Sequence, residues 1–466
     1  NCSQSAISIY VCAKLGLIKV YGDPNNIPSE LPAVLSRVEC KGIVMLADEM
    51  TIEKFREASK NLPSIKHIIL VGSNQVTMLD AHRYDELLKQ GETKKIQQAD
   101  ALAERQASID PDSPLAIVLT SGTTGIPSQV PLTNFNILNA LIRHWDYLKE
   151  SRARPCITQS MSHASAGIFM TLGPAVYKST VVVPSFYFDA VKSARCIDKE
   201  KCTNILCSPI FFRYLLADPD RSKYDFSSLK SVMVGAALTQ PELLHQVEKE
   251  LGITALCKGY GSSEIGCVLC DSFNCKDERR FTSIGQCWDN LEVKLVDANG
   301  RIVPIGCEGE LWVRSSYIMR GYYRNPEKTA ETITESQWLK TGDLLKMDED
   351  GYLYFIERIK HLIIKPNGAI VYSSEIEQAL EDHESVERAH VFTVPDPRVQ
   401  GIICAFVKLR SGKACEADEL KKFLGSSLSD DKIPDHIHFV DDFPRTSIGK
   451  VPKCKLVDQM MKILNL

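Results

Sequence analysis

Predicted helices alternate with short apolar runs along most of this 466-residue chain, and this alternation constrains its fold more than any other feature. In the first third, the pattern AVLSRVEC precedes GIVML, FREASKNL precedes KHIILVG, and a long polar helix precedes PLAIVL. Further along, TVVVPSF and KSVMVGA alternate with helical patterns such as QPELLHQVEKELG. Strands that alternate with helices predict βαβ units around parallel sheets, and the chain is long enough for several such units.

The chain changes its pattern at about residue 280. LEVKLVDANGRIVP, GELWVRS and GYLYFIERI are alternating strands with Asn-Gly and Asp-Gly turns, which favour antiparallel hairpins. From 360 to 466 helices and strands alternate again over a length typical of one small domain. We therefore predict an α/β protein with a large N-terminal domain over 1–357, made of layered βαβ subdomains. This domain includes a small β-barrel-like subdomain over about 280–357, and a small α+β domain covers 360–466.

Composition and charge exclude several classes of protein. A formal net charge of -4 without a basic run argues against a nucleic-acid partner. Uninterrupted apolar runs are too short for a membrane-spanning helix. The sixteen cysteines are scattered through a chain with ample apolar material for a core, which favours reduced thiols over disulfides. Cys267 and Cys270 form a CxxC pair, but a zinc site would need a second pair at similar spacing.

One loop has the composition of a phosphate-binding loop. It follows the apolar strand LAIVL, and its glycines and hydroxyls would let the backbone approach a phosphate and donate hydrogen bonds to it. A simple polar turn after a strand explains the same residues, and a Walker loop is excluded because no Gly-Lys-Ser/Thr follows. The loop comprises Thr120, Ser121, Gly122, Thr123, Thr124 and Gly125.

Four motifs in series decide between these readings. LTSGTTGIP, GYGSSE, WLKTGD and PRTSIGK occur in this order, and the chain resembles from about Leu15 to its C-terminus the superfamily of acyl-CoA synthetases, peptide-synthetase adenylation domains and luciferases. The resemblance implies activation of a carboxylic acid with ATP and Mg²⁺ to an acyl-AMP, followed by transfer to CoA. It also implies that the C-terminal domain is a mobile lid with a hinge near 358–360. The family's first segment is missing, so we expect an N-terminally incomplete chain whose targeting signal is unreadable.

The resemblance assigns roles to individual residues. Glu264 matches the family's magnesium-holding glutamate, and a carboxylate is a ligand that Mg²⁺ accepts alongside substrate phosphates. Asp343 matches the aspartate that binds the ribose hydroxyls, and Arg358 the arginine that reaches ribose or phosphate. Two backbone segments match the nucleotide pocket. They are Gly235, Ala236 and Ala237, which line the adenine, and Tyr260, Gly261, Ser262 and Ser263, which precede Glu264.

Three further residues match catalytic or moving parts of the family. Lys450 corresponds to the lysine that the lid delivers between the carboxylate and the α-phosphate, where a cation stabilises the meeting of two anions. Lys360 occupies the hinge position. His163 in SMSHASAG resembles the histidine beside the acyl and pantetheine passage.

The sequence departs from the family in several places. Ser128 and Gln129 replace the usual loop lysine and glycine, which removes a cation from the β- and γ-phosphates. Glu357 replaces a glycine before the hinge, and Pro366 and Asn367 follow it in a segment that faces CoA. Cys287 stands where proline is common.

The leading hypothesis is an acyl-CoA synthetase for a fatty or aryl acid, because the predicted pocket segments are small and apolar. The alternatives are an adenylation module that passes acyl-AMP to a carrier-protein thiol or an amine, and a catalytically impaired nucleotide-binding homologue. The expected compartment is the cytoplasm or an organelle matrix.

Overall fold

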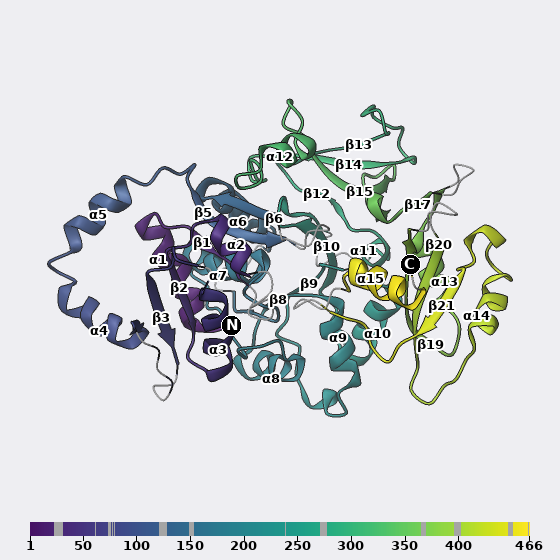
Figure 1. Cartoon of the computed structure of the whole chain (residues 1–466), viewed down its shortest axis with the longest axis horizontal. Helices are drawn as coiled ribbons and strands as arrows, with labels where there is room; N and C mark the ends of the chain where they lie inside the picture. The colour runs from purple at the N-terminus through teal and green to yellow at the C-terminus, as the bar shows by residue number, and fades with distance from the viewer. Residues whose placement is uncertain are drawn as a thin grey trace. The chain divides into compact units, whose positions relative to one another are not determined.

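The structure is a computed structural model that describes the chain except for residues 23–30, 61, 73–75, 77, 79, 121–127, 149–152, 238, 271–276, 365–369, 396–401, 446–450 and 465. The chain forms two compact units. Unit 1 comprises Asn1–Thr282, Cys287–Leu291 and Arg314–Gln337, and unit 2 comprises Ser283–Gln286, Glu292–Val313 and Trp338–Leu466. Figure 1 labels their helices and strands.

Unit 1 opens with helix α1 (Ser3–Leu15) and a three-stranded sheet of order β1-β5-β6. Strand β1 (Lys19–Val20) runs parallel to β5 (Pro114–Thr120), and β5 is antiparallel to β6 (Ser128–Thr133). Thr120 and Ser128 face each other in that register, so the predicted phosphate loop connects two neighbouring strands. Helix α6 (Asn134–Leu148) follows β6 directly.

A second sheet confirms the βαβ pattern of the first third. Strands β2 (Gly42–Leu46), β3 (His67–Val71) and β4 (Ala81–Arg83) are parallel. Helix α3 (Glu49–Ser59) connects β2 to β3 and begins at Asp48, whose side chain accepts a hydrogen bond from the amide of Thr51. The remaining helices of this region are α2 (Leu31–Arg37), α4 (Tyr84–Lys94) and α5 (Ala99–Ala107).

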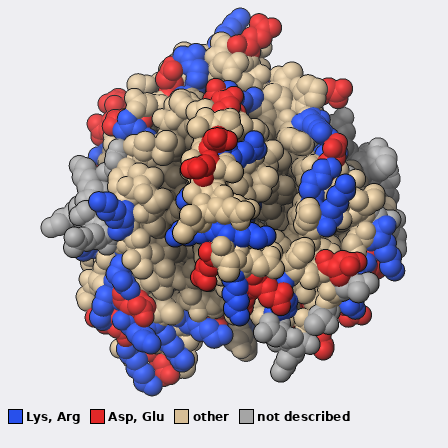
Figure 2. All heavy atoms as spheres, turned by 90° about the vertical axis from the view of Figure 1, so that its left-hand side faces the viewer, with Lys and Arg blue, Asp and Glu red and all other residues tan. Residues whose placement is uncertain are grey.

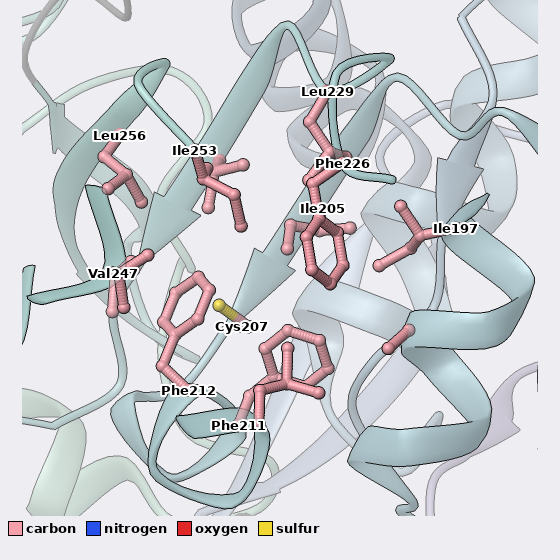
Figure 3. Close-up of a cluster of buried hydrophobic side chains, with 14 of the residues drawn as sticks. Ile197, Ile205, Cys207, Phe211, Phe212, Phe226, Leu229, Val247, Ile253 and Leu256 are labelled. Carbon is pink, nitrogen blue, oxygen red and sulfur yellow. The ribbon is translucent and has the colours of Figure 1, made fainter. Parts of the chain in front are cut away.

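The largest sheet contains four adjacent parallel strands, β7 (Pro155–Cys156), β8 (Asn204–Cys207), β9 (Ser231–Val234) and β10 (Leu256–Ser262). Strand β11 (Gly266–Cys270) returns antiparallel beside β10. Helices α8 (Ala190–Glu200), α9 (Pro209–Ala217) and α10 (Pro241–Leu251) share one apolar core with these strands (Figures 1 and 3). The other elements of this region are η2 (Ser165–Met170), α7 (Thr171–Tyr177), η3 (Arg221–Lys223), α11 (Arg279–Thr282), β12 (Gln286–Cys287) and α12 (Pro326–Thr332).

Phe211 and Phe212 of α9 are fully buried in this core, with Cys207 of β8 drawn beside them in Figure 3. Burial raises the pKa of the Cys207 thiol, which therefore stays protonated. All fourteen cysteines whose side chains the structure describes are free thiols, as expected. Cys267 packs with Met233 and Trp288, whereas the side chains of Cys270 and Cys275 lie outside the described residues.

Unit 2 contains the four-stranded sheet of order β13-β14-β15-β16, formed by Glu292–Val296, Glu308–Arg314, Leu339–Met347 and Leu353–Arg358. Strand β15 pairs antiparallel with both β14 and β16. Gly300 and Gly351 have positive φ angles of 76° and 84°, as the Asn-Gly and Asp-Gly turns predict. The antiparallel region predicted near 280–357 is therefore present.

The C-terminal part of unit 2 is a small α+β assembly. Strand β19 (Val386–Val394) pairs antiparallel with β20 (Ile402–Leu409), which is parallel to β21 (His436–Phe439). Helices α13 (Ser373–Glu381) and α15 (Lys453–Leu464) contact β19. The other elements are η4 (Ile359–His361), β17 (Ile363–Ile364), β18 (Ile370–Val371), α14 (Ala417–Leu424) and η5 (Asp430–Lys432).

The α/β fold class is as predicted, whereas the domain boundary and the hinge at 358–360 stay predictions. The compact units group most of the antiparallel sheet with the C-terminal region, but compactness does not identify the point about which a chain moves. On the face that Figure 2 shows, acidic and basic side chains are interspersed among neutral ones. Within the described residues, no helix has the length and apolar character needed to cross a membrane.

Candidate functional site

The predicted phosphate loop joins β5 to β6 in unit 1. Thr120 ends β5, and its hydroxyl donates a long hydrogen bond of 3.5 Å to the carbonyl of Ser128. Ser121, Gly122, Thr123, Thr124 and Gly125 lie outside the described residues. Beyond the loop, Gln129 is buried, and its carbonyl accepts a hydrogen bond of 2.9 Å from the amide of Tyr323. Residues at both ends of the loop are therefore fixed by neighbouring backbone.

Glu264 lies in the turn between β10 and β11. Its amide donates to the Ser262 hydroxyl at 3.3 Å, and its carbonyl accepts from the amide of Met319 at 2.8 Å. The phenol of Tyr322 donates to Glu264 Oε1 at 3.1 Å. Burial and the negative charge of Glu264 raise the pKa of Tyr322, so the phenol is protonated at neutral pH and can only stabilise the carboxylate as a donor.

The geometry around Glu264 fits a magnesium ligand. The side chain is only partly buried, and its second carboxylate oxygen retains acceptor capacity that Tyr322 does not use. Mg²⁺ usually binds through one or two carboxylates and completes its shell with water and phosphate oxygens. One carboxylate held in a fixed position can therefore be the only protein ligand that such a site needs.

Glycines bring the strand ends β9 and β10 close together. A Cβ atom on Gly235 would lie 2.8 Å from the carbonyl oxygen of Gly259, and one on Gly261 would lie 1.9 Å from that of Gly266. These glycines are thus required by packing, whatever they bind. Ala236 has a φ of 69°, an uncommon angle for a residue with a side chain, and Ala236 and Ala237 are both exposed. The predicted adenine segment is a strained, accessible turn.

His163 lies in the turn before η2 and is half-buried. Its carbonyl accepts a hydrogen bond of 2.7 Å from Gly167, where a Cβ would clash with Met161 O at 2.2 Å. Helix η2 is a π-helix, a form often found at functional sites. A Cβ on Gly266 would lie 3.7 Å from the Phe169 ring, so the His163 segment approaches the Glu264 turn. The His163 segment and the Glu264 turn, both predicted to belong to the active site, are therefore neighbours.

Asp343 and Arg358 face each other across strands β15 and β16 of unit 2. Arg358 Nε lies 3.0 Å from Asp343 Oδ1, and the Asp343 side chain is 5% exposed against 42% for Arg358. Gly342 of β15 has a φ of 69°, and its amide donates to Glu310 Oε1 at 3.0 Å, which fixes the backbone before Asp343. The two residues predicted to bind ribose thus form one ion pair.

The structure describes only some of the other residues predicted to be functional in unit 2. Lys360 is exposed in η4, and Lys450, Pro366 and Asn367 lie outside the described residues. Glu357 is buried and accepts from the Ser373 hydroxyl at 2.6 Å and the Ser374 amide at 3.0 Å. Burial opposes ionisation of Glu357, but hydrogen bonds from His361 and Ser373 and the charge of Lys453 outweigh burial and lower its pKa. Glu357, which stands where the family has glycine, therefore has a structural role.

One cluster of possible metal ligands lies elsewhere in the described part of unit 2. Ligand atoms of His383, Cys415 and Glu419 lie within 4.8 Å of one another. However, His383 Nδ1 accepts a hydrogen bond from the Ser385 amide, which leaves the proton on Nε2, the atom nearer Glu419. Burial and Glu419 raise the pKa of Cys415 to about 11. A metal bound here would have to displace a proton from both groups.

Sequence reasoning missed two residues near the candidate site, Tyr322 and Lys328. Tyr322 holds Glu264, and the ammonium of Lys328 donates to the Ser128 hydroxyl. No short motif indicates either residue, because their partners lie far away along the chain. Only the packing of the 314–337 segment within unit 1 reveals them.

Comparisons with known proteins identify the family of the chain. Residues 1–323 match the AMP-binding enzyme family, and residues 375–450 match the AMP-binding enzyme C-terminal domain. The chain is 31% identical to a mitochondrial medium-chain acyl-CoA ligase, ACSF2, of Danio rerio, and the alignment covers 100% of this chain and 79% of that protein.

Solved structures share the fold. An anthranilate CoA ligase in complex with anthranoyl-AMP superposes with a TM-score of 0.81 and 23% identity, covering 98% of this chain and 86% of that one. The amide bond synthetase McbA from Marinactinospora thermotolerans has a TM-score of 0.70 and 22% identity, covering 97% and 99%. The chain thus belongs to the AMP-binding enzyme family, which confirms the expected acyl-CoA synthetase-like, adenylate-forming enzyme.

Proposed function

We propose that the protein is an AMP-forming acyl-CoA synthetase that uses ATP, Mg²⁺ and CoA. The observation that carries the proposal is the Glu264 turn: a carboxylate held by Tyr322 beside strand ends that packing requires to be glycine. This turn lies in the region that matches the AMP-binding enzyme family. The similarity to a medium-chain acyl-CoA ligase over the whole chain supports CoA as the acceptor.

In the first half-reaction, a carboxylate oxygen of the acid attacks the α-phosphorus of ATP, and the bond to pyrophosphate breaks. Glu264 holds Mg²⁺, which neutralises phosphate charge when bound. The loop hydroxyls and amides bind phosphate oxygens, and Gly235, Ala236 and Ala237 line the base. Asp343 accepts hydrogen bonds from the ribose hydroxyls, with Arg358 fixing its orientation. Lys450 supplies positive charge between the two reacting anions, whose mutual repulsion is the main barrier.

In the second half-reaction, the CoA thiol attacks the acyl carbonyl carbon and AMP leaves. The C-terminal region rotates about Lys360 between the two steps, and His163 flanks the acyl passage. The acid is an apolar acyl or aryl acid, because the mostly small and apolar segment that follows His163 approaches the Glu264 turn at Phe169. The compartment is an organelle matrix or the cytoplasm, and the mitochondrial location of the Danio rerio relative supports the former.

A two-stage assay tests this proposal. Pyrophosphate exchange into ATP, measured over a panel of aliphatic and aryl acids, reports acyl-AMP formation alone. Adding CoA should then convert the best acid into its thioester with release of AMP. Exchange without any acyl-CoA would instead favour a carrier-protein thiol or an amine as acceptor. ATP binding without exchange for any acid would identify a non-catalytic homologue and defeat the enzyme proposal.

A further inference from the structure

Lys328 and Ser128 are 200 positions apart in the chain, and they are hydrogen-bonded in unit 1. Ser128 opens β6, the strand that follows the phosphate loop, while Lys328 lies in the first turns of α12. Both side chains are partly exposed. The lysine ammonium therefore lies at the start of the strand that follows the phosphate loop, and it can still reach solvent or a ligand.

The segment that carries Lys328 is fixed on both sides. Tyr322 donates to Glu264 through its phenol and to Thr329 Oγ1 of α12 through its amide, at 3.1 Å and 2.9 Å. The Tyr323 amide donates to Gln129, the neighbour of Ser128. The ammonium of Lys328 also lies 4.3 Å from the centroid of the Tyr322 ring. One short segment thus connects the end of the phosphate loop to the Glu264 turn.

The charge of Lys328 has no carboxylate partner among the ion pairs of the described residues. By contrast, its neighbours Arg320 and Arg324 pair with Asp112 and Glu39, at 2.6 Å and 2.8 Å. The Ser128 hydroxyl accepts one of three ammonium hydrogens and compensates no charge. A cation held by the first residue of β6 and by the tyrosine that holds Glu264 favours a polyanion as its ligand.

We propose that Lys328 binds the terminal phosphates of ATP and supplies the positive charge that the phosphate loop lacks at Ser128. The proposal rests on the proposed function, since it takes ATP as the ligand. In this arrangement Ser128 positions the ammonium, and Tyr322 spaces it from the metal-binding Glu264. The cation therefore comes from α12 instead of the loop.

Binding measurements with two nucleotides test the proposal. Because AMP lacks the β- and γ-phosphates, Lys328→Ala should weaken Mg-ATP binding at least tenfold, roughly the effect of one charge-assisted hydrogen bond, and leave AMP binding unchanged. Lys328→Arg should retain most of the affinity. The double variant Ser128→Lys/Lys328→Ala places the lysine at position 128, the other partner of this contact. The positive charge is then restored, so ATP affinity should recover. Lys249→Ala, on the exposed face of α10, is the matched control.

Each outcome separates this proposal from the proposed function. If wild-type protein binds ATP and Lys328→Ala binds it equally well, Lys328 has no role in phosphate binding, although the enzyme proposal stands. Equal losses for ATP and AMP would show that Lys328 only supports the fold, which thermal unfolding of the variant would also reveal. Failure of the wild-type protein to bind ATP would overturn both proposals.

Discussion

Asp343 is nearly buried and paired with Arg358, an arrangement that fixes the direction of its carboxylate. If this carboxylate binds the ribose, the wild-type enzyme should bind ATP more tightly than 2′-deoxy-ATP, which lacks one donor. Asp343→Ala should reduce that preference about tenfold, since a hydrogen bond to a charged group is lost. Competition binding of the two nucleotides measures the ratio. Asp418→Ala, on the exposed side of α14, should leave the ratio unchanged, and an unchanged ratio in Asp343→Ala would remove Asp343 from the ribose site.

If Glu264 holds Mg²⁺, its replacement should change the rate of pyrophosphate exchange. Glu264→Gln keeps the shape and a hydrogen-bond acceptor for Tyr322 but removes the charge that holds Mg²⁺. Pyrophosphate exchange should fall about a hundredfold, comparable to the loss of one transition-state contact. The exposed Glu242 of α10 provides the control, Glu242→Gln. A Glu264→Gln enzyme that exchanges at the wild-type rate over a range of Mg²⁺ concentrations would contradict the assignment.

At the scale of elements, the β10–β11 hairpin requires glycine, which has no side chain, at position 261. A Cβ on Gly261 would lie 1.9 Å from the carbonyl oxygen of Gly266, so Gly261→Ala must separate the two strands. We expect a loss of roughly 2 kcal/mol or more in unfolding free energy, in the range of strongly destabilising substitutions. Gly91→Ala is the contrasting control: this glycine of α4 has no atom within 4 Å of its Cβ position, so alanine should stabilise by about 0.5–1 kcal/mol. Urea unfolding of both variants measures the difference, and similar stabilities would refute the packing argument.

Local sequence patterns predicted helices and strands well, because each of these elements depends mainly on residues close to it in the sequence. The parallel pairing of β2 with β3 and the hairpin that opposes Asp343 and Arg358 both follow from apolar periodicity and turn residues. Contacts between segments that are far apart in the sequence produce no such periodicity and no turn signal. Lys328 meets Ser128 only because the 314–337 segment returns to unit 1, and Glu357 can be buried because the Ser373 hydroxyl and the Ser374 amide donate hydrogen bonds to its carboxylate. The sequence therefore indicated the motifs but not the side chains that complete them.

At the scale of the whole molecule, each unit has its own apolar core. One contains Phe211, Phe212 and Leu244 of unit 1, and another contains Ile376, Val391 and Ile403 of unit 2. Since each of these cores is formed within one unit, we expect the units to unfold in separate transitions. Calorimetry and urea unfolding should resolve two steps, and a single coincident transition by several probes would contradict this.

Glu377 makes the stability of unit 2 depend on pH. Its carboxylate lies 2.9 Å from the ammonium of Lys453 and accepts from the Val391 amide at 2.8 Å. Burial opposes ionisation, but Lys453, His390 and the Val391 amide together lower the pKa of Glu377 from 4.5 to about 2. A carboxyl whose pKa is lower in the folded state contributes stability above its unfolded pKa and loses it as protons bind. Unit 2 should therefore lose stability as the pH falls from about 4.5 towards 2.

Lys453→Met tests the same pair directly. At pH 7 it leaves the Glu377 carboxylate buried without its cation, which should cost unit 2 about 3 kcal/mol. The pKa of Glu377 then rises, so the variant loses less stability on acidification, and the gap to the wild-type protein should narrow between pH 7 and pH 3. Lys455→Met, on the exposed face of the same helix, should change neither value. Urea titrations at the two pH values decide the matter: a gap that stays constant would mean that Lys453 acts through packing and not through the charge of Glu377.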